Sequence, residues 1–308
     1  MNNISIRQII IFDAVAQAES YTRAAEFLDL SQSAISQQMK RLEKSIKSPL
    51  FERRGNNLGL TSVGFAFHKY SKGIMVQYQN MQAAMGEIKD VHEGSITISA
   101  ATTANHFISH MLAGFSRHYK NISFTLDITN RESLVKQLTN YVPDFVVMGE
   151  PPENMELESE EIMENPLILV VSPQHPLASA TNLTMKDVIN EVVVVREKGS
   201  GTRAAIRRHF DSNECRFESS FEMGSNEAVK HAVVAGLGLG IVSLHTIKME
   251  LESKNLVILD VENMPIRRSW HIVTRKGKHL SPAAKAFHRY IMEHAKEYTD
   301  TYRKIATF

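Results

Sequence analysis

The sequence predicts an α+β multidomain protein: an N-terminal winged helix-turn-helix, a long helix, and a two-subdomain α/β domain. Three observations predict this fold class. First, three short helical patterns precede a Gly-Asn-Asn turn. Second, the next segment has one apolar stripe along the length of a long helix. Third, short apolar strands alternate with helices in the rest of the chain. We expect domains at residues 1–60, 61–91 and 92–308.

Composition and charge set the class of protein. Of the 308 residues, 43% are apolar and 22% are charged, which is ordinary for a folded globular chain. No apolar run reaches the length of about 18 residues that a membrane helix needs, and the polar start of the chain does not resemble a secretory signal. The only cysteine, Cys215, has no partner for a disulfide or a cysteine metal site. We therefore expect a cytoplasmic protein without membrane contact.

The first 47 residues predict three helices. The first covers residues 4–18, and the second starts at the capping residue Ser20 and contains the small pair Ala24 and Ala25. Ser31 caps the third helix. Its apolar residues recur at spacings of four, three and four and form one buried stripe: Ile35, Met39, Leu42 and Ile46.

The tight turn between the second and third helices predicts a helix-turn-helix, and the third helix then enters the DNA major groove. Residues 48–61 follow as a β-wing with two adjacent arginines suited to phosphate contact. The charge of residues 1–60 is 8 − 6 = +2, a modest local excess. The alternative, a polar helix face that binds nothing, stays open. The expected DNA-binding residues are Thr22, Arg23, Ser31, Gln32, Ser33, Ser36, Gln37, Lys40, Arg53 and Arg54.

This segment, "SYTRAAEFLDLSQSAISQQMKRLEKSIKSPLFERRGNNLGLTSVG", resembles the LysR-type transcriptional regulators. The resemblance implies a regulator, and no enzyme, that binds double-stranded DNA at a two-fold related operator. Two positions depart from the family pattern. Family members often have Pro in place of Ser33 and Gly in place of Lys47, where a helix C-terminal glycine is favoured.

The next segment predicts a long helix with one narrow apolar stripe, beginning at the cap Thr61. A heptad seam of this kind needs a partner, although packing on its own domain is the alternative. In the family it is a dimerisation helix, which implies a homodimer or a homotetramer, with RNA polymerase as a further possible partner. The pattern ends at "DVHEGS", residues 90–95, and its seam residues are Ile74, Tyr78, Met81, Met85 and Ile88.

From Gly94 onward, alternating strands and helices predict parallel α/β sheets with ligand sites at the strand ends. We expect subdomain I at residues 92–164 plus 267–308, and subdomain II at residues 165–266, with a cleft between them. The effector domain of the LysR family resembles periplasmic binding proteins of this form.

The sharpest ligand signal is "VVVVREKGSGTRAAIRRHF", in which a strand, a Gly-Ser-Gly-Thr turn and a helix start follow one another. Backbone amides at a helix N-terminus bind anions. The alternative is a capped helix whose arginines pair with the chain's own acids. Other strand ends converge on the same cleft and predict a pocket for a small anionic metabolite, with no cofactor. The expected effector-binding residues are Thr102, Thr103, Asn130, Arg131, Gly149, Arg196, Gly199, Ser200, Gly201, Thr202, Arg203, Ser225 and Asn226.

Within the LysR family, "VREKGSGTRAAIRRHF", "EMGSNEAVKHAVVAGLGLGIVSLHTI" and "MGEPPENMELE" look most like the regulators of RuBisCO (Calvin cycle) operons. That resemblance implies a phosphorylated or nucleotide-like effector. Regulation of sulfur, nitrogen or aromatic metabolism is the alternative, and an enzyme acting on a sugar phosphate is an alternative of another class.

Two further patterns carry no predicted chemistry. His106 and His110 have a spacing that can hold zinc but lack an obvious third ligand, so no metal site is expected. The glutamates from Glu150 to Glu164 are interpreted as a solvated face.

Overall fold

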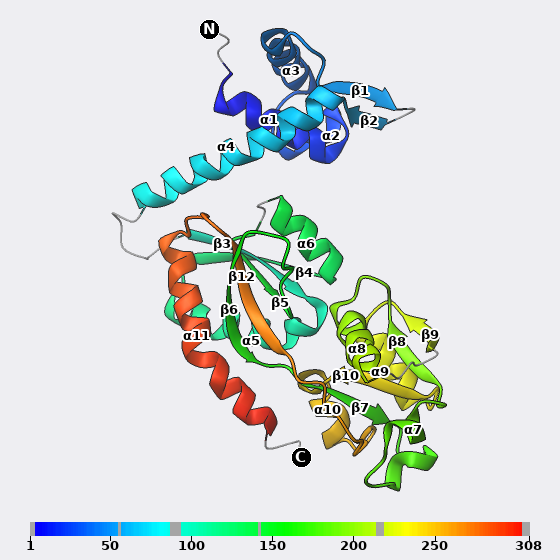
Figure 1. Cartoon of the computed structure of the whole chain (residues 1–308). Coiled ribbons are helices and arrows are strands. Elements are labelled where there is room, and N and C mark those ends of the chain that lie inside the picture. Colours follow the sequence, from blue (N-terminus) through cyan, green and yellow to red (C-terminus); the bar gives the residue numbers. More distant parts are fainter. Residues whose placement is uncertain (1–3, 55–56, 87–93, 141–142, 214–218, 304–308) are drawn as a thin grey trace. The chain divides into compact units, whose positions relative to one another are not determined.

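The computed structural model describes residues 4–54, 57–86, 94–140, 143–213 and 219–303. The chain forms two compact units, Met1–Gly86 and Glu87–Phe308. Figure 1 colours the first unit blue to cyan and the second from green-cyan to red. Among the described helices, none is both long enough and apolar enough to cross a membrane.

The first unit contains the predicted helices and wing (Figure 1). Serine hydroxyls begin all three helices: Ser5 accepts from Gln8 N, Ser20 from Arg23 N and Ser31 from Ala34 N. These caps satisfy amides that have no partner within a helix. The elements are α1 (Ile6–Ala18), α2 (Tyr21–Phe27), α3 (Gln32–Ile46), β1 (Phe51–Arg54), β2 (Asn57–Leu60) and α4 (Ser62–Gly86).

The wing is joined to α3 by one carboxylate. Glu43 Oε1 accepts hydrogen bonds from Leu50 N at 2.7 Å and from Phe51 N at 3.3 Å. Burial, and then the nearby Glu43 charge, raise the pKa of Tyr21 to about 12. Lys47 ends α3 with φ 61°, in the left-handed region that favours glycine, as the departure from the family pattern predicted.

Helix α4 begins as predicted, since Thr61 Oγ1 accepts from Gly64 N at 2.9 Å. Two side chains of its predicted heptad seam, Ile74 and Met81, are each 49% exposed. Ile88, the last predicted seam residue, and most of "DVHEGS" lie outside the described residues. Exposed apolar side chains at heptad spacing are typical of a helix face that packs on another helix, so this seam favours a partner helix.

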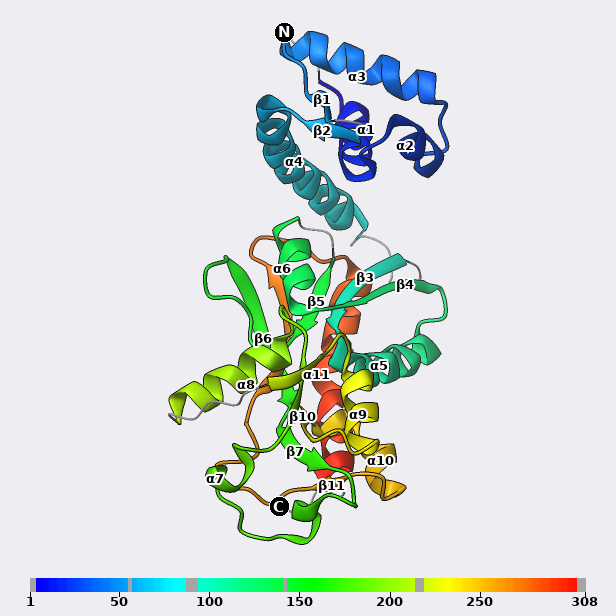
Figure 2. The same cartoon turned by 90° about the vertical axis from the view of Figure 1, so that its right-hand side faces the viewer.

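The second unit contains two five-stranded sheets, with the second below the first in Figure 2. The first sheet has the order β4-β3-β5-β12-β6 and the second β11-β7-β10-β8-β9. The strands are β3 (Gly94–Ala101), β4 (Ile122–Thr129), β5 (Phe145–Met148), β6 (Leu157–Glu164), β7 (Leu167–Val171), β8 (Val193–Arg196), β9 (Ser219–Met223), β10 (Leu239–Ser243), β11 (Val257–Ile258) and β12 (Ser269–Arg275).

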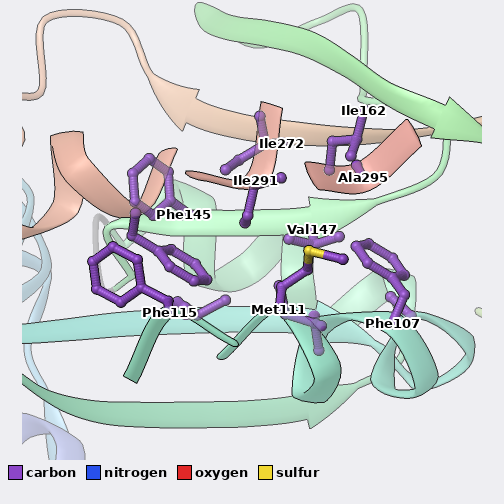
Figure 3. Packing of buried hydrophobic residues seen from close by; sticks show 14 of the residues in the cluster. Phe107, Met111, Phe115, Phe145, Val147, Ile162, Ile272, Ile291 and Ala295 are labelled. Carbon is purple, nitrogen blue, oxygen red and sulfur yellow. The ribbon is translucent and has the colours of Figure 1, made fainter. Parts of the chain in front are cut away.

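Helices cover both faces of each sheet, so β5 is buried at every residue. On the first sheet, Phe145 and Val147 face α5 and α11 (Figure 3), whereas Val146 and Met148 face α6. The helices are α5 (Asn105–His118), α6 (Arg131–Thr139), α7 (Met185–Val188), α8 (Gly201–Ser212), α9 (Asn226–Val234), α10 (Lys248–Glu252) and α11 (Pro282–Arg303), with the 3-10 turns η1 (Thr102–Ala104), η2 (Pro176–Ser179) and η3 (Leu244–Thr246).

The sheets are mixed and not parallel, which corrects the sequence prediction. β12 runs antiparallel to β5 and β6, and β7 runs antiparallel to β10 and β11. The chain leaves the first sheet through β6 and returns through β12, so these two strands run in opposite directions. At the crossing they stay side by side, because Asn165 N donates to Arg268 O at 2.6 Å and Leu167 N donates to Ile266 O at 3.0 Å.

Candidate nucleic-acid interface and anion cavity

The predicted DNA-binding side chains lie on one side of α3, opposite its buried stripe. Gln32, Ser33, Gln37 and Lys40 are exposed, and Ser36 is half-buried. Their hydroxyl, amide and ammonium groups can donate to base edges and phosphates, and the hydroxyls and amides can also accept.

The other predicted DNA contacts flank this face. Thr22 and Arg23 are exposed at the start of α2, and the exposed Arg53 lies on β1 opposite Leu58. Ser31 Oγ is already used as the cap of α3 and lies 3.1 Å from Ser33 Oγ. The side chain of Arg54 lies outside the described part of the chain.

A cavity of about 720 Å³ lies in the second unit, where strand ends of both sheets meet. Its volume suits a small metabolite. Nine of the thirteen predicted effector-binding residues line this cavity: Thr102, Thr103, Asn130, Arg131, Gly149, Arg196, Ser200, Gly201 and Thr202.

Arg196 is the last residue of β8, the other eight residues follow the ends of strands, and two of them cap helices. Asn130 Oδ1 accepts from Ser133 N at 3.0 Å at the start of α6, and Ser200 Oγ accepts from Arg203 N at 3.5 Å at the start of α8. Two helix N-termini, each the positive end of a helix dipole, thus border the cavity. The carboxyl ends of β3, β4, β5 and β8 lead into it, as expected for a sheet of this kind.

Two buried or half-buried arginines link the two sheets across the cavity. Arg196, only 3% exposed, is held by Glu197 at 2.7 Å and donates to Thr102 Oγ1 at 3.4 Å. Arg268 donates to Thr202 Oγ1 at 3.4 Å, and its Cζ lies 5.7 Å from the ring centroid of Trp270. Burial, and then the charges of Arg208 and Arg196, lower the pKa of Arg268 to about 9, so its guanidinium stays charged at neutral pH.

Two further arginines contact Glu150, which lies two residues after the end of β5. The backbone carbonyl of Glu150 accepts from Arg131 Nη1, and its carboxylate pairs with Arg208 Nη2. Burial, and then the neighbouring Arg208 charge, lower the pKa of Arg131, while Glu150 partly offsets the shift. The two guanidiniums are therefore close enough to repel each other, with Glu150 between them.

Four predicted effector-binding residues lie outside the cavity lining. Arg203 donates to Arg196 O at 2.9 Å and pairs with Glu222, so its guanidinium holds α8 against β8 and β9. Gly199, with φ 91°, packs its backbone against α6. Ser225 caps α9, and Asn226 is buried at the start of that helix. Arg203 therefore fits the alternative stated for this segment, a capped helix whose arginines pair with the chain's own acids.

Several cavity residues were not predicted from the sequence. Arg208 and His209 lie within α8. Arg267 and Arg268 lie just before β12, where the chain returns to the first sheet. Helical periodicity could have identified Arg208, because it lies seven residues after Gly201 and four after Ala204 on one helix face. Burial lowers the pKa of His209 more than its hydrogen bond with the Asn263 backbone raises it, which favours the neutral ring.

The cavity has an excess of positive charge. Five arginines line it, Arg131, Arg196, Arg208, Arg267 and Arg268, against the acids Glu150 and Asp211, so the balance is 5 − 2 = +3. Guanidiniums and helix N-termini around one cavity favour an anion carrying more than one negative charge.

The histidine pair discounted from the sequence has an ordinary setting. His106 Nε2 lies 3.7 Å from Glu227 Oε1, an ion pair only when the ring is protonated. Within the described ranges, no group of three or more His, Cys, Asp or Glu side chains is arranged to hold a metal ion.

Comparison with known proteins shows the family of both units. The family "Bacterial regulatory helix-turn-helix protein, lysR family" matches residues 6–65, and "LysR substrate binding domain" matches residues 89–296. A RuBisCO operon transcriptional regulator of Allochromatium vinosum is 45% identical over 293 residues, covering 95% of this chain and 97% of the relative.

Two solved structures are also similar. The regulatory domain of Synechocystis CcmR, in complex with 2-PG, has 34% identity and a TM-score of 0.64, and the match covers 66% of this chain and 98% of that domain. A full-length OxyR variant of Pseudomonas aeruginosa has a TM-score of 0.77 at 16% identity, over 96% of this chain and 95% of the other, and shows the same fold.

Proposed function

The chain belongs to the LysR family of bacterial transcriptional regulators, and on that premise we propose that it controls RuBisCO or related carbon-fixation genes in response to a phosphorylated anion. The observation that carries the effector proposal is the cavity with charge +3. The relative with a RuBisCO operon function covers the whole architecture, and the CcmR domain is similar to the part that holds the cavity.

We propose that α3 reads base edges through Gln37 and Ser33, while Arg53 contacts phosphates. Because LysR regulators act as oligomers, the exposed seam of α4 is proposed to pair with a second copy, in a homodimer or a homotetramer. Two DNA-binding units then meet a two-fold related operator in the cytoplasm, with RNA polymerase as a further proposed partner.

The effector acts by binding one arrangement of the two subdomains more tightly than the other. Groups from both subdomains surround the cavity, such as Thr102 and Thr202, so an anion held between them favours the closed arrangement. Arginine pairs and helix N-termini bind phosphate oxygens well. No turnover is proposed, and a sugar phosphate incubated with the pure protein should be recovered unchanged.

The test is a titration of the full chain with 2-phosphoglycolate, the 2-PG of the CcmR structure. Binding is monitored by thermal unfolding and by the fluorescence of Trp270 in the cavity wall. A ligand that binds only the folded state raises the melting temperature. We expect stabilisation of the wild type and its loss in Arg268→Met. Arg207→Met is the matched control, because Arg207 is exposed on α8 outside the cavity lining.

Two results would redirect the proposal. Stabilisation only by sulfate or by unphosphorylated carboxylates would favour the sulfur, nitrogen or aromatic alternative and leave DNA binding unaffected. Equal loss of stabilisation in Arg268→Met and Arg207→Met would refute the assignment of the effector to this cavity.

A further inference from the structure

Glu150 contacts both Arg131 and Arg208. Its carbonyl oxygen accepts from Arg131 and its carboxylate pairs with Arg208. All three residues line the cavity. A carboxylate and a backbone oxygen of the protein thus occupy two guanidiniums in the way that an anionic ligand would.

The loop that carries Glu150 is held in place. Pro151 and Pro152 follow it, and a residue before proline is restricted to extended backbone angles. On the other side, the carbonyl oxygen of Gly149 lies 3.1 Å from His271 Nδ1 on β12. The backbone at Glu150 is therefore restricted, which keeps the base of this side chain at the cavity edge beside Arg208.

A ligand can easily displace Glu150 from its ion pair with Arg208. The side chains of Arg208 and Glu150 are 56% and 60% exposed, and exposed ion pairs contribute little to stability because water screens them. The anchoring groups at the other end of the cavity differ in this respect: Arg196 is buried and Ser200 caps α8. Arg208 lies eight residues after Ser200, about 12 Å along the helix axis.

We propose that Glu150 is a built-in competitor for the effector: its carboxylate occupies the Arg208 guanidinium that a second anionic group of the ligand would bind. This inference rests on the proposed function. A ligand with one anionic group binds at the start of α8 and leaves the pair intact. A ligand with two anionic groups must displace Glu150 from Arg208, so Glu150 sets the preference between the two classes.

The expected effect follows from the strength of an exposed pair. Its loss on ligand binding weakens affinity by about 1.4- to 5-fold, and repulsion between Glu150 and the second anionic group adds to this. Glu150→Gln should therefore raise the affinity for a two-group anion by about two- to tenfold. The gain should shrink as salt rises, because salt screens both the Glu150–Arg208 attraction and the repulsion between Glu150 and the ligand that the substitution removes.

The experiment titrates the full chain with inorganic phosphate, which has one anionic group, and 2-phosphoglycolate, which has two, and reads apparent affinity from thermal shifts. Glu150→Gln should tighten 2-phosphoglycolate binding and leave phosphate binding unchanged. Glu153→Gln is the matched control, since it removes the same charge from an exposed position outside the cavity lining. Arg208→Gln should weaken only 2-phosphoglycolate, and in that background Glu150→Gln should have no further effect.

Each other outcome overturns the inference. An equal gain for both ligands, or for both glutamate variants, would indicate a general charge effect without competition. No gain, or weaker binding, in Glu150→Gln would show that the carboxylate does not compete. If the wild type binds neither phosphate nor 2-phosphoglycolate, the proposed phosphorylated effector itself fails, which is a distinguishable result.

Discussion

Replacing Lys230 with methionine should destabilise the effector-binding unit, because a buried ammonium holds three oxygens there. Lys230 Nζ lies 2.8 Å from Glu227 Oε2, 2.8 Å from Glu250 Oε1 and 2.9 Å from the carbonyl oxygen of Thr246. Its side chain is only 5% exposed. All three donors of the ammonium are therefore used, and α9 is tied to the η3 and α10 segment.

The magnitude follows from what the substitution leaves behind. Removing one member of a buried charge pair costs about 3–5 kcal/mol, but Glu227 is 54% exposed and can regain water. We therefore expect a loss of about 2–4 kcal/mol. For a unit of this size, each kcal/mol lowers the melting temperature by about 2–4 °C, which gives a decrease of about 5–15 °C.

The pH at which the measurement is made does not complicate this prediction. Burial alone would lower the pKa of Lys230, but hydrogen bonds and charges from Glu227 and Glu250 outweigh burial and raise it. A raised folded-state pKa contributes stability that is complete below the unfolded value of 10.5 and is lost only as pH rises through the folded value. At pH 7 the full contribution is present.

The assay is thermal unfolding of the full chain followed by the fluorescence of Trp270, the only tryptophan in the sequence. This residue is buried in the second unit, so the signal reports on that unit alone. Lys248→Met is the control, because its contact with Glu252 is long, at 3.8 Å, and exposed. A Lys230→Met protein that melts within about 2 °C of the wild type would refute the reasoning.

Three other predictions concern the remaining parts of the chain. Glu43→Ala should increase amide hydrogen exchange at Leu50 by about 10- to 100-fold, because a charged acceptor is lost; less than threefold would contradict its role in the wing. Gln37→Ala should alter sequence preference in binding-site selection, whereas Arg53→Ala should weaken binding to all sequences alike; identical profiles would disprove this division. Burial lowers the pKa of His245 to about 4, so its stabilising effect is lost as pH falls from 6.5 to 4. Between pH 7 and 5 we expect the wild type to lose about 2 kcal/mol more stability than His245→Gln, as unfolding of both proteins at both pH values can check.

The helices and the wing of the first unit could be predicted because their signals are local. Ser20 and Ser31 cap helices that follow them directly, and the stripe of α3 lies within one helix. Strand β6 was not predicted as a strand. Its sequence is rich in glutamate, which is depleted in strands, but an edge strand tolerates charged side chains that point to solvent.

The cavity was predicted in part for a related reason. Turns at the ends of adjacent strands meet at one edge of a sheet, so Thr102 after β3 and Asn130 after β4 could be grouped from the sequence. Ser200 follows β8 of the second sheet and joins them through the predicted cleft between the subdomains. Choosing between Arg203 and Arg208 required the rotation of α8 about its axis, which depends on how the helix packs on the sheet. The antiparallel strands at the crossing likewise depend on contacts between residues far apart in the chain, such as Leu167 and Ile266.

The arginine lining of the cavity determines which partner titrates when a phosphorylated ligand binds. Guanidiniums keep their proton throughout the physiological range, and even Arg268, with its pKa lowered to about 9, is almost fully protonated at pH 7. A phosphate monoester, by contrast, takes up its second proton near pH 6. A change of pH near neutrality therefore alters the charge of the metabolite and leaves the charge of these arginines unchanged.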